Sequence, residues 1–135
     1  MIDVALTRIV IRDGADRQHI FLSEVDGARS FPIVIGNNEA GEIHRIVHGH
    51  QTERPLTHQL TFEAIQALGA RIRTVDIVDL KHNTFYARIV LAGDAPAEPK
   101  EIDARPSDAI ALALRAKCQI RVAEGVLDEA CSKEP

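Results

Sequence analysis

The segment Pro106-Ser107-Asp108-Ala109-Ile110-Ala111-Leu112-Ala113-Leu114 decides the fold of this chain, because its second half is apolar nearly all the way round a helix. A helix of this kind is usually buried on more than one side, and its alanines let neighbouring backbone approach closely. We therefore expect a helix from Pro106 to about Lys117 at the centre of the core. Its N-terminus should open onto whatever cleft the domain possesses.

Alternating apolar and polar residues on both sides of this helix predict strands, and short turns between them predict antiparallel pairing. The strands are expected at residues 2–12, 19–25, 29–35, 71–80, 84–91, 101–104 and 120–123. Pro32 removes a backbone donor from the third strand, so we place that strand at an edge or a bulge. In the first strand, strict alternation puts Val10 on the same face as Val4, and Ile9 on the opposite face.

Two further helices are expected between the third and fourth strands. The first follows an N-cap at Asn37 and ends at Gly49. The second begins with Pro55 and ends at Gly69, because proline suits the first helical position and glycine the position after the last. The apolar stripe of this second helix is expected to consist of four residues: Leu60, Ala64, Ala67 and Leu68.

The composition fits one globular domain, since 45% of the 135 residues are hydrophobic and 27% are charged. We predict a single α+β domain over residues 1–131 with a short tail over 132–135. Its mainly antiparallel or mixed sheet should pack on the buried Ala-rich helix and the two further helices. A short helix over 125–131 should end the domain, and residues 93–100, which contain two prolines, should form an exposed loop.

The same composition bounds location and partners. No apolar run approaches the roughly 18 residues of a membrane span, and the first residues do not resemble a signal peptide. Cys118 and Cys131 lack a CxxC pattern and are typical of reduced thiols, so we expect a cytoplasmic protein with no membrane partner. The net charge of −4 and the absence of Trp argue against strong electrostatic or stacking recognition of nucleic acid.

The start of the Ala-rich helix gathers residues that can carry chemistry. Asp103 and Asp108 bracket Arg105 and Ser107. Two carboxylates near one point can hold a divalent cation or act as acid and base, while an arginine and a helix N-terminus favour an anion such as phosphate. A structural interpretation also fits, with Asp and Ser capping the helix and Asp103 paired with Arg105.

Glu39 is a second candidate, because the helical period places it within the apolar stripe of the first predicted helix. A carboxylate on an inward face is costly unless it is paired or lines a cavity. Alternatively, Glu39 lies in the first turn and favours the helix dipole while it still reaches solvent.

Four histidines fall within 15 residues: His44, His48, His50 and His58. The i, i+4 spacing of the first two can bind a metal, which would make a dedicated metal-binding protein. However, there is no HExxH pattern, and these two lie toward the polar side of the helix, so we expect a surface pair. His58 is the better single candidate, because it follows Arg54-Pro55-Leu56-Thr57 at the start of a helix.

The chain as a whole closely resembles the bifunctional nuclease domain family. Four blocks carry the resemblance: Pro32-Ile33-Val34-Ile35-Gly36 with Glu39-Ala40, Arg54-Pro55-Leu56-Thr57-His58, Thr84-Phe85-Tyr86-Ala87, and Asp103-Ala104-Arg105-Pro106-Ser107-Asp108-Ala109-Ile110-Ala111-Leu112-Ala113. The resemblance implies a mixed α+β fold, hydrolysis of RNA and DNA, and association into homo-oligomers. Where the family commonly has Thr-His-Asp, this chain has Gln59, which removes one carboxylate from a metal site there.

The leading hypothesis is therefore a phosphodiesterase that acts on RNA or DNA. The candidate catalytic residues are Glu39, His58, Asp103 and Asp108, and the candidate substrate-binding residues are Arg54, Thr57, Arg105 and Ser107. The carboxylates would orient water or a divalent cation, the arginines would contact phosphate, and the histidine would act as general acid or base. The alternative is a non-catalytic regulatory or scaffold oligomer, in which these residues are capped or paired separately instead of converging in one cleft.

Overall fold

Helix α3 (Pro106–Ala116) lies at the centre of the computed structural model, which describes residues 1–93 and 98–132. Each of the residues 109–113 is almost fully buried. Pro106 suits the first turn because its fixed φ angle is already helical and its missing N–H needs no partner. The helix ends at Lys117, which adopts the left-handed conformation. The prediction that the Ala-rich segment forms a buried helix is confirmed.

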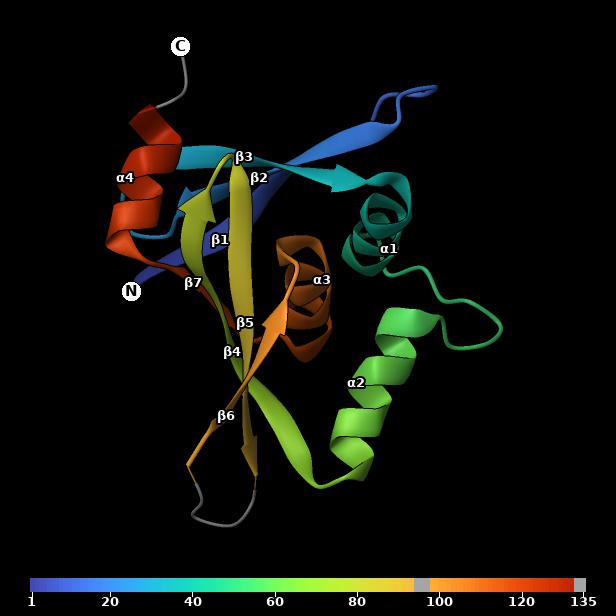
Figure 1. Cartoon of the computed structure of the whole chain (residues 1–135). Helices are drawn as coiled ribbons and strands as arrows, with labels where there is room; N and C mark the ends of the chain where they lie inside the picture. Colours follow the sequence, from blue (N-terminus) through green and yellow to red (C-terminus); the bar gives the residue numbers. More distant parts are fainter. Residues whose placement is uncertain (94–97, 133–135) are drawn as a thin grey trace.

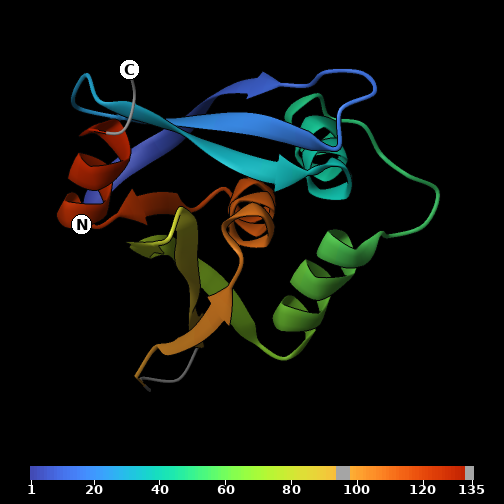
Figure 2. The same ribbon diagram turned by 45° about the horizontal axis from the view of Figure 1, so that its top comes forward.

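A seven-stranded mixed sheet curls around α3, as Figure 2 shows. The other elements are β1 (Ile2–Val10), β2 (Arg17–Glu24), β3 (Ser30–Gly36), α1 (Asn37–Val47), α2 (Thr57–Ala67), β4 (Ala70–Lys81), β5 (Thr84–Gly93), β6 (Lys100–Ala104), β7 (Gln119–Val122) and α4 (Glu124–Ser132). The strand order is β3-β2-β1-β7-β4-β5-β6. The short strand β7 joins the two halves, because it pairs antiparallel with β1 and parallel with β4. The predicted α+β class is confirmed.

All seven predicted strands are present, with ends shifted by at most two residues. Pro32 lies in the edge strand β3, as expected from its missing donor. The faces of β1 are a correction. The register shifts between Leu6 and Arg8, and beyond this irregularity Ile9 packs against the core together with Val4. The prediction of strict alternation was wrong because a β-bulge inserts one residue and exchanges the two faces of a strand.

Helix α1 begins one residue earlier than expected. Gly36 occupies the N-cap position and Asn37 is the first helical residue, so the prediction of Asn37 as N-cap was wrong. The Asn37 side chain instead donates to the Ala15 carbonyl oxygen and accepts from Gln18. These contacts come from the β1–β2 turn and the start of β2, which local sequence spacing does not reveal. Gly49, with a φ angle of 67°, follows the helix end as predicted.

Helix α2 begins at Thr57 rather than Pro55, and its predicted apolar stripe was also wrong. Leu60 is 61% exposed and Leu68 is 87% exposed. The side chains of α2 that pack against the core are Phe62 and Ile65. The helix lies at the margin of α3, where Phe62 and Ile65 become partly buried and Leu60 stays exposed (Figures 1 and 2).

The buried side chains form one hydrophobic cluster around α3. In the ranges 1–93 and 98–132, no helix has the length and apolar character needed to cross a membrane. Of the predicted exposed loop, residues 94–97 lie outside the described residues, and so do residues 133–135 of the predicted tail.

Candidate functional site

A cleft of about 750 Å³ lies between helices α1, α2 and α3. This volume falls in the range of roughly 300–1,000 Å³ that is typical of ligand sites. Its charged and ionisable lining residues are Glu39, Glu42, Arg45, His58, Arg105 and Asp108. The cleft therefore brings together side chains that are as many as 69 positions apart in the sequence, and several of them are the candidates expected from sequence.

Three helices direct their N-terminal turns at this cleft. Glu39 lies in the first turn of α1, His58 in the first turn of α2, and Asp108 in the first turn of α3. In the described chain, none of these three helices has a side-chain hydrogen bond at its N-cap. Since the first N–H groups of a helix carry partial positive charge, these three helix ends add positive potential to a cleft whose side chains include three carboxylates and two arginines.

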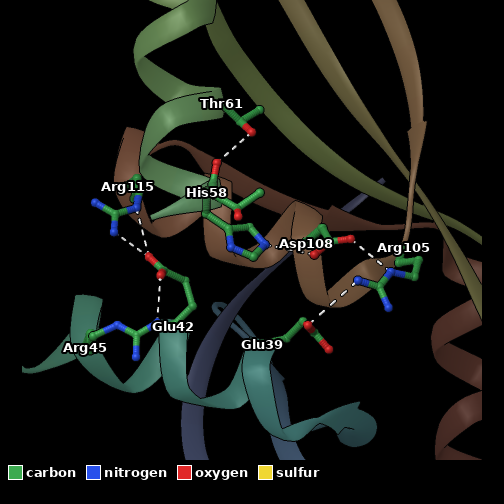
Figure 3. A network of polar contacts seen from close by, with 9 residues as sticks. Glu39, Glu42, Arg45, His58, Thr61, Arg105, Asp108 and Arg115 are labelled. Atoms are coloured by element: carbon green, nitrogen blue, oxygen red, sulfur yellow. Dashed lines mark hydrogen bonds and ion pairs between the residues drawn. The ribbon is translucent and has the colours of Figure 1, made fainter. Parts of the chain in front are cut away.

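A connected chain of polar contacts crosses the cleft, and we call these four residues, Glu39, Arg105, Asp108 and His58, the cleft chain (Figure 3). His58 Nε2 lies 2.8 Å from Asp108 Oδ1. Arg105 Nε donates to Asp108 Oδ2 at 2.9 Å. The same guanidinium lies 3.8 Å from the Glu39 carboxylate. Both oxygens of Asp108 are thus engaged, one by a histidine and one by an arginine.

The electrostatics of Asp108 follow from these contacts. Partial burial by itself raises the pKa of Asp108, but hydrogen bonds from His58 and Arg105 outweigh burial and lower the pKa overall. In the other direction, the hydrogen bond to Asp108 raises the pKa of Arg105. Asp108 is therefore ionised at neutral pH and can orient the His58 ring as an acceptor.

A second network consists of Glu42, Arg45 and Arg115, which we call the buried triad because its carboxylate is buried (Figure 3). Glu42 and Arg45 line the other side of the cleft. Only 2% of the Glu42 side chain is exposed. Arg115 Nε donates to one Glu42 oxygen at 3.1 Å, and Arg45 Nη2 donates to the other at 3.1 Å. Burial raises the pKa of Glu42, and the hydrogen bonds from Arg115 and Arg45 more than offset it, so the pKa is lowered overall.

Sequence reasoning missed all three residues of the buried triad. The usable signal was the i, i+3 spacing of Glu42 and Arg45 on a helix that also carries apolar residues. Arg115 could not be found in this way, because it lies 73 positions away from Glu42 and reaches it only in the folded chain.

Other candidates lie outside the cleft chain. Thr57 lines the cleft as the first residue of α2. Ser107 is buried and lines a neighbouring hollow of about 880 Å³, which shares Glu39 and Arg105 with the cleft. Arg54 is exposed in the connection between α1 and α2 and does not line the cleft.

Asp103 lies outside the cleft as well, although it stands five positions from Asp108. It is exposed in the edge strand β6 and pairs with Arg88 of β5 in the strand register. Its neighbour Ala104 packs against the core, so the alternation of a strand turns Asp103 to the other face of the sheet. The structure thus separates the two aspartates that the sequence brought together.

The four histidines that are close in the sequence also lie in two separate places in the structure. The rings of His44 and His48 are stacked at 4.1 Å, and His50 lies 6.0–6.2 Å from both, whereas His58 contacts Asp108. Within residues 1–93 and 98–132, no group of three or more His, Cys, Asp or Glu is arranged to hold a metal ion. In the cleft, the cationic Arg105 already lies between the carboxylates of Glu39 and Asp108. This donor set therefore suits an ion pair better than a metal centre.

Comparison with known proteins agrees with the four sequence blocks. Residues 20–135 match the bifunctional nuclease domain. The chain belongs to the bifunctional nuclease domain family. An uncharacterized protein of Mycobacterium tuberculosis is 38% identical over 128 residues, which cover 95% of this chain and 75% of the relative. The resemblance inferred from sequence is thereby confirmed.

Two plant relatives are named as nucleases. Bifunctional nuclease 1 of Oryza sativa subsp. japonica is 29% identical over 114 residues, or 83% of this chain and 34% of the rice protein. Bifunctional nuclease 1 of Arabidopsis thaliana is 35% identical over 74 residues, or 53% of this chain and 22% of the relative. The chain therefore corresponds to a minor part of each plant protein.

Proposed function

We propose that this chain hydrolyses phosphodiester bonds of RNA or DNA in the cleft between α1, α2 and α3. The observation that carries the proposal is the pair of His58 and Asp108 in a cleft at which three helix N-termini meet. A histidine held by a carboxylate is suited to proton transfer, and the helix ends favour the negative charge of phosphate. The names of the plant relatives support the same reaction class.

His58 is the proposed general base. When the ring donates from Nε2 to the ionised Asp108, Nδ1 carries the lone pair and can take a proton from the attacking water. The water oxygen then bonds to phosphorus and the bond to the leaving oxygen on the opposite side breaks. The leaving oxygen takes a proton from solvent, and the protonated histidine releases its proton to solvent. Asp108 holds the tautomer and stabilises the charged ring in between.

Arg105 is the proposed contact for the scissile phosphate. Its side chain is 67% exposed, so the guanidinium can bind a phosphate oxygen without leaving Asp108. Glu39 lies beside this guanidinium. Thr57 lines the cleft and Ser107 lines the neighbouring hollow, and both hollows include Glu39 and Arg105, so each residue is a candidate contact for the substrate. We give Arg54 and Asp103 no part in bond cleavage, because both lie outside the cleft.

A non-catalytic oligomeric scaffold is the second candidate, and one observation favours it. Leu60 of α2 is exposed, and so are Leu56 and Leu68, which flank the helix. Association into homo-oligomers stays a prediction, which the mass of the particle in solution would test. A cytoplasmic location also stays a prediction, and it is supported by Cys118 and Cys131 being thiols and not a disulfide.

The decisive experiment is a nuclease assay on highly purified protein with labelled single-stranded RNA and DNA, with and without chelator. Asp108→Asn should reduce the rate by about 100-fold or more while the circular dichroism spectrum is kept. Asp103→Asn is the matched variant from the same segment, and it should retain most of the rate. Equal rates for the wild type and Asp108→Asn would trace the activity to a contaminant and overturn the proposal.

A further inference from the structure

The buried triad has more positive charge than its carboxylate can balance. Glu42 is ionised, and both Arg45 and Arg115 are permanently charged, so the three residues carry one excess positive charge. Arg115 donates to Glu42 through both Nε and Nη2. The charge of Glu42 is therefore largely balanced by Arg115, and the excess resides on Arg45.

Arg45 also has unused donors. An arginine offers five N–H donors. In the described part of the chain, Arg45 donates a single hydrogen bond, from Nη2 to Glu42. Its Nε is buried without a partner there, which is an unfavourable state for a donor. Arg45 lines the cleft and 32% of its side chain is exposed, so a ligand in the cleft can reach the guanidinium.

The opposite wall of the cleft differs in sign. There, Arg105 lies between the carboxylates of Glu39 and Asp108, so with a neutral His58 the cleft chain carries one excess negative charge. One wall of the cleft thus holds the proposed proton-transfer pair, His58 and Asp108. The other wall holds Arg45, a cation whose Nε has no hydrogen-bond partner in the described chain. A substrate with a single phosphate can occupy only the first wall, whereas a nucleic acid chain carries further phosphates for the second.

We propose that Arg45 binds a second phosphate of the substrate, next to the scissile one, and so selects oligonucleotides over small phosphodiesters. This inference rests on the proposed function of the cleft. Arg45 acts here in substrate binding and not in proton transfer. It should therefore affect KM for substrates with two or more phosphates and leave kcat largely unchanged.

The test compares two substrates: bis(p-nitrophenyl) phosphate, which has one phosphate, and a fluorescent single-stranded trinucleotide. Arg45→Gln should raise KM for the trinucleotide about tenfold and lower the salt dependence of binding by about one counterion. Its kinetics on the small diester should not change. Arg45→Lys, which keeps the charge, should recover part of the affinity.

Arg88→Gln is the matched control, because Arg88 also pairs with a carboxylate, Glu101, but lies on the other face of the sheet. Unchanged KM for the trinucleotide in Arg45→Gln, or an equal loss on both substrates, would overturn the inference while leaving the nuclease proposal intact. If Arg45→Gln does not fold, Arg45→Lys becomes the test variant. Lysine keeps the charge but lacks the paired N–H donors of the guanidinium, so KM should still rise for the trinucleotide and not for the small diester.

The two proposals fail in different ways. If the wild type cleaves neither substrate, the proposed nuclease function fails. The role of Arg45 in phosphate binding is then tested by the affinity for a phosphorothioate trinucleotide, measured by fluorescence anisotropy at increasing KCl concentrations. Binding about tenfold weaker in Arg45→Gln would support a polyanion site in the cleft, and equal binding would remove it.

Discussion

The cleft chain and the buried triad use the same kinds of charged groups in different surroundings. In both, a carboxylate on a helix accepts hydrogen bonds through both of its oxygens. One donor lies three positions away on or beside the same helix, and the other lies 50 or more positions away in the sequence. Asp108 is 30% exposed, whereas Glu42 is 2% exposed. The same kind of interaction therefore occurs in two environments, since solvent reaches the carboxylate of Asp108 and is largely kept from that of Glu42.

The partners of the two carboxylates differ as well. Glu42 is held by two arginines, which cannot give up their protons. Asp108 is held by one arginine and by His58, whose imidazole ring can both accept and donate a proton. A network of permanent charges can fix helices in place, but it cannot move a proton. We infer that the triad stabilises the walls of the cleft and that the cleft chain provides its chemistry.

The largest expected effect is on stability. Glu42→Ala leaves Arg45 and Arg115, whose side chains are 32% and 21% exposed, without their carboxylate. We expect a cost of about 3 kcal/mol, the low end for breaking a buried ion pair, because both arginines keep access to water. Glu39→Ala is the matched change on the same helix, and it should cost at most about 1 kcal/mol because its ion pair to Arg105 is long, at 3.8 Å, and the arginine is 67% exposed. Urea denaturation at pH 7 measures both. Similar losses of unfolding free energy in the two variants would contradict the distinction between a buried triad that stabilises the fold and a cleft chain that does not.

The next effect is on rate. His58→Gln keeps an N–H donor that can reach Asp108 but removes the group that exchanges a proton. We expect the rate constant to fall about 100-fold, equivalent to about 2.7 kcal/mol of transition-state stabilisation, with the unfolding free energy changed by less than about 1 kcal/mol. Single-turnover cleavage of labelled RNA measures the rate, and urea denaturation measures the stability. A stable variant with full activity would show that His58 serves only to hold α2 against α3.

The smallest effect is the dependence of stability on pH. The folded-state pKa values of Glu42 and Asp108 are both lowered, so each stabilises the fold above its unfolded pKa and loses this contribution as the pH falls through its folded pKa. The melting temperature should therefore fall on acidification below pH 4.5 for Glu42 and below pH 3.8 for Asp108, where the free side chains titrate.

Two variants assign this acid dependence to its sources. Glu42→Gln should flatten the fall in melting temperature below about pH 4.5 more than Asp108→Asn does, because Asp108 is more exposed to solvent. Thermal melts between about pH 3 and pH 7 provide the comparison. A flatter profile in Asp108→Asn than in Glu42→Gln would reverse the proposed roles of the two carboxylates.

Much of the fold could be predicted from local patterns. The seven strands and the helix ends at Gly49 and Gly69 follow from alternation and from glycine conformation. The errors occurred where distant contacts overrule local preference. Asn37 binds Gln18 and the Ala15 carbonyl instead of capping its own helix. Helix α2 has apolar residues on more than one face, and only its packing position decides that Phe62 and Ile65, rather than Leu60, contact the core.

The candidate site was likewise predicted well from local patterns, except where the tertiary structure separates residues that are close in the sequence. Residue type and helix position alone pointed to His58, Arg105, Asp108 and Glu39, and all four line the cleft. Asp103 was grouped with them because it is close in sequence. In the structure, the alternation of β6 turns it away. Proximity along the chain is thus a poor guide to a site when a strand ends and a helix begins between the residues concerned.

The burial of α3 was decided by its own residues, because a helix that is apolar on nearly all sides has no stable place except the core. The site was decided by tertiary structure. His58 and Asp108 are 50 positions apart, and Glu42 and Arg115 are 73 apart. Side-chain patterns along a helix report on neighbours three or four positions away. Only the curl of the sheet around α3 brings three helix N-termini to one cleft, and with them the side chains to which we assign the proposed chemistry.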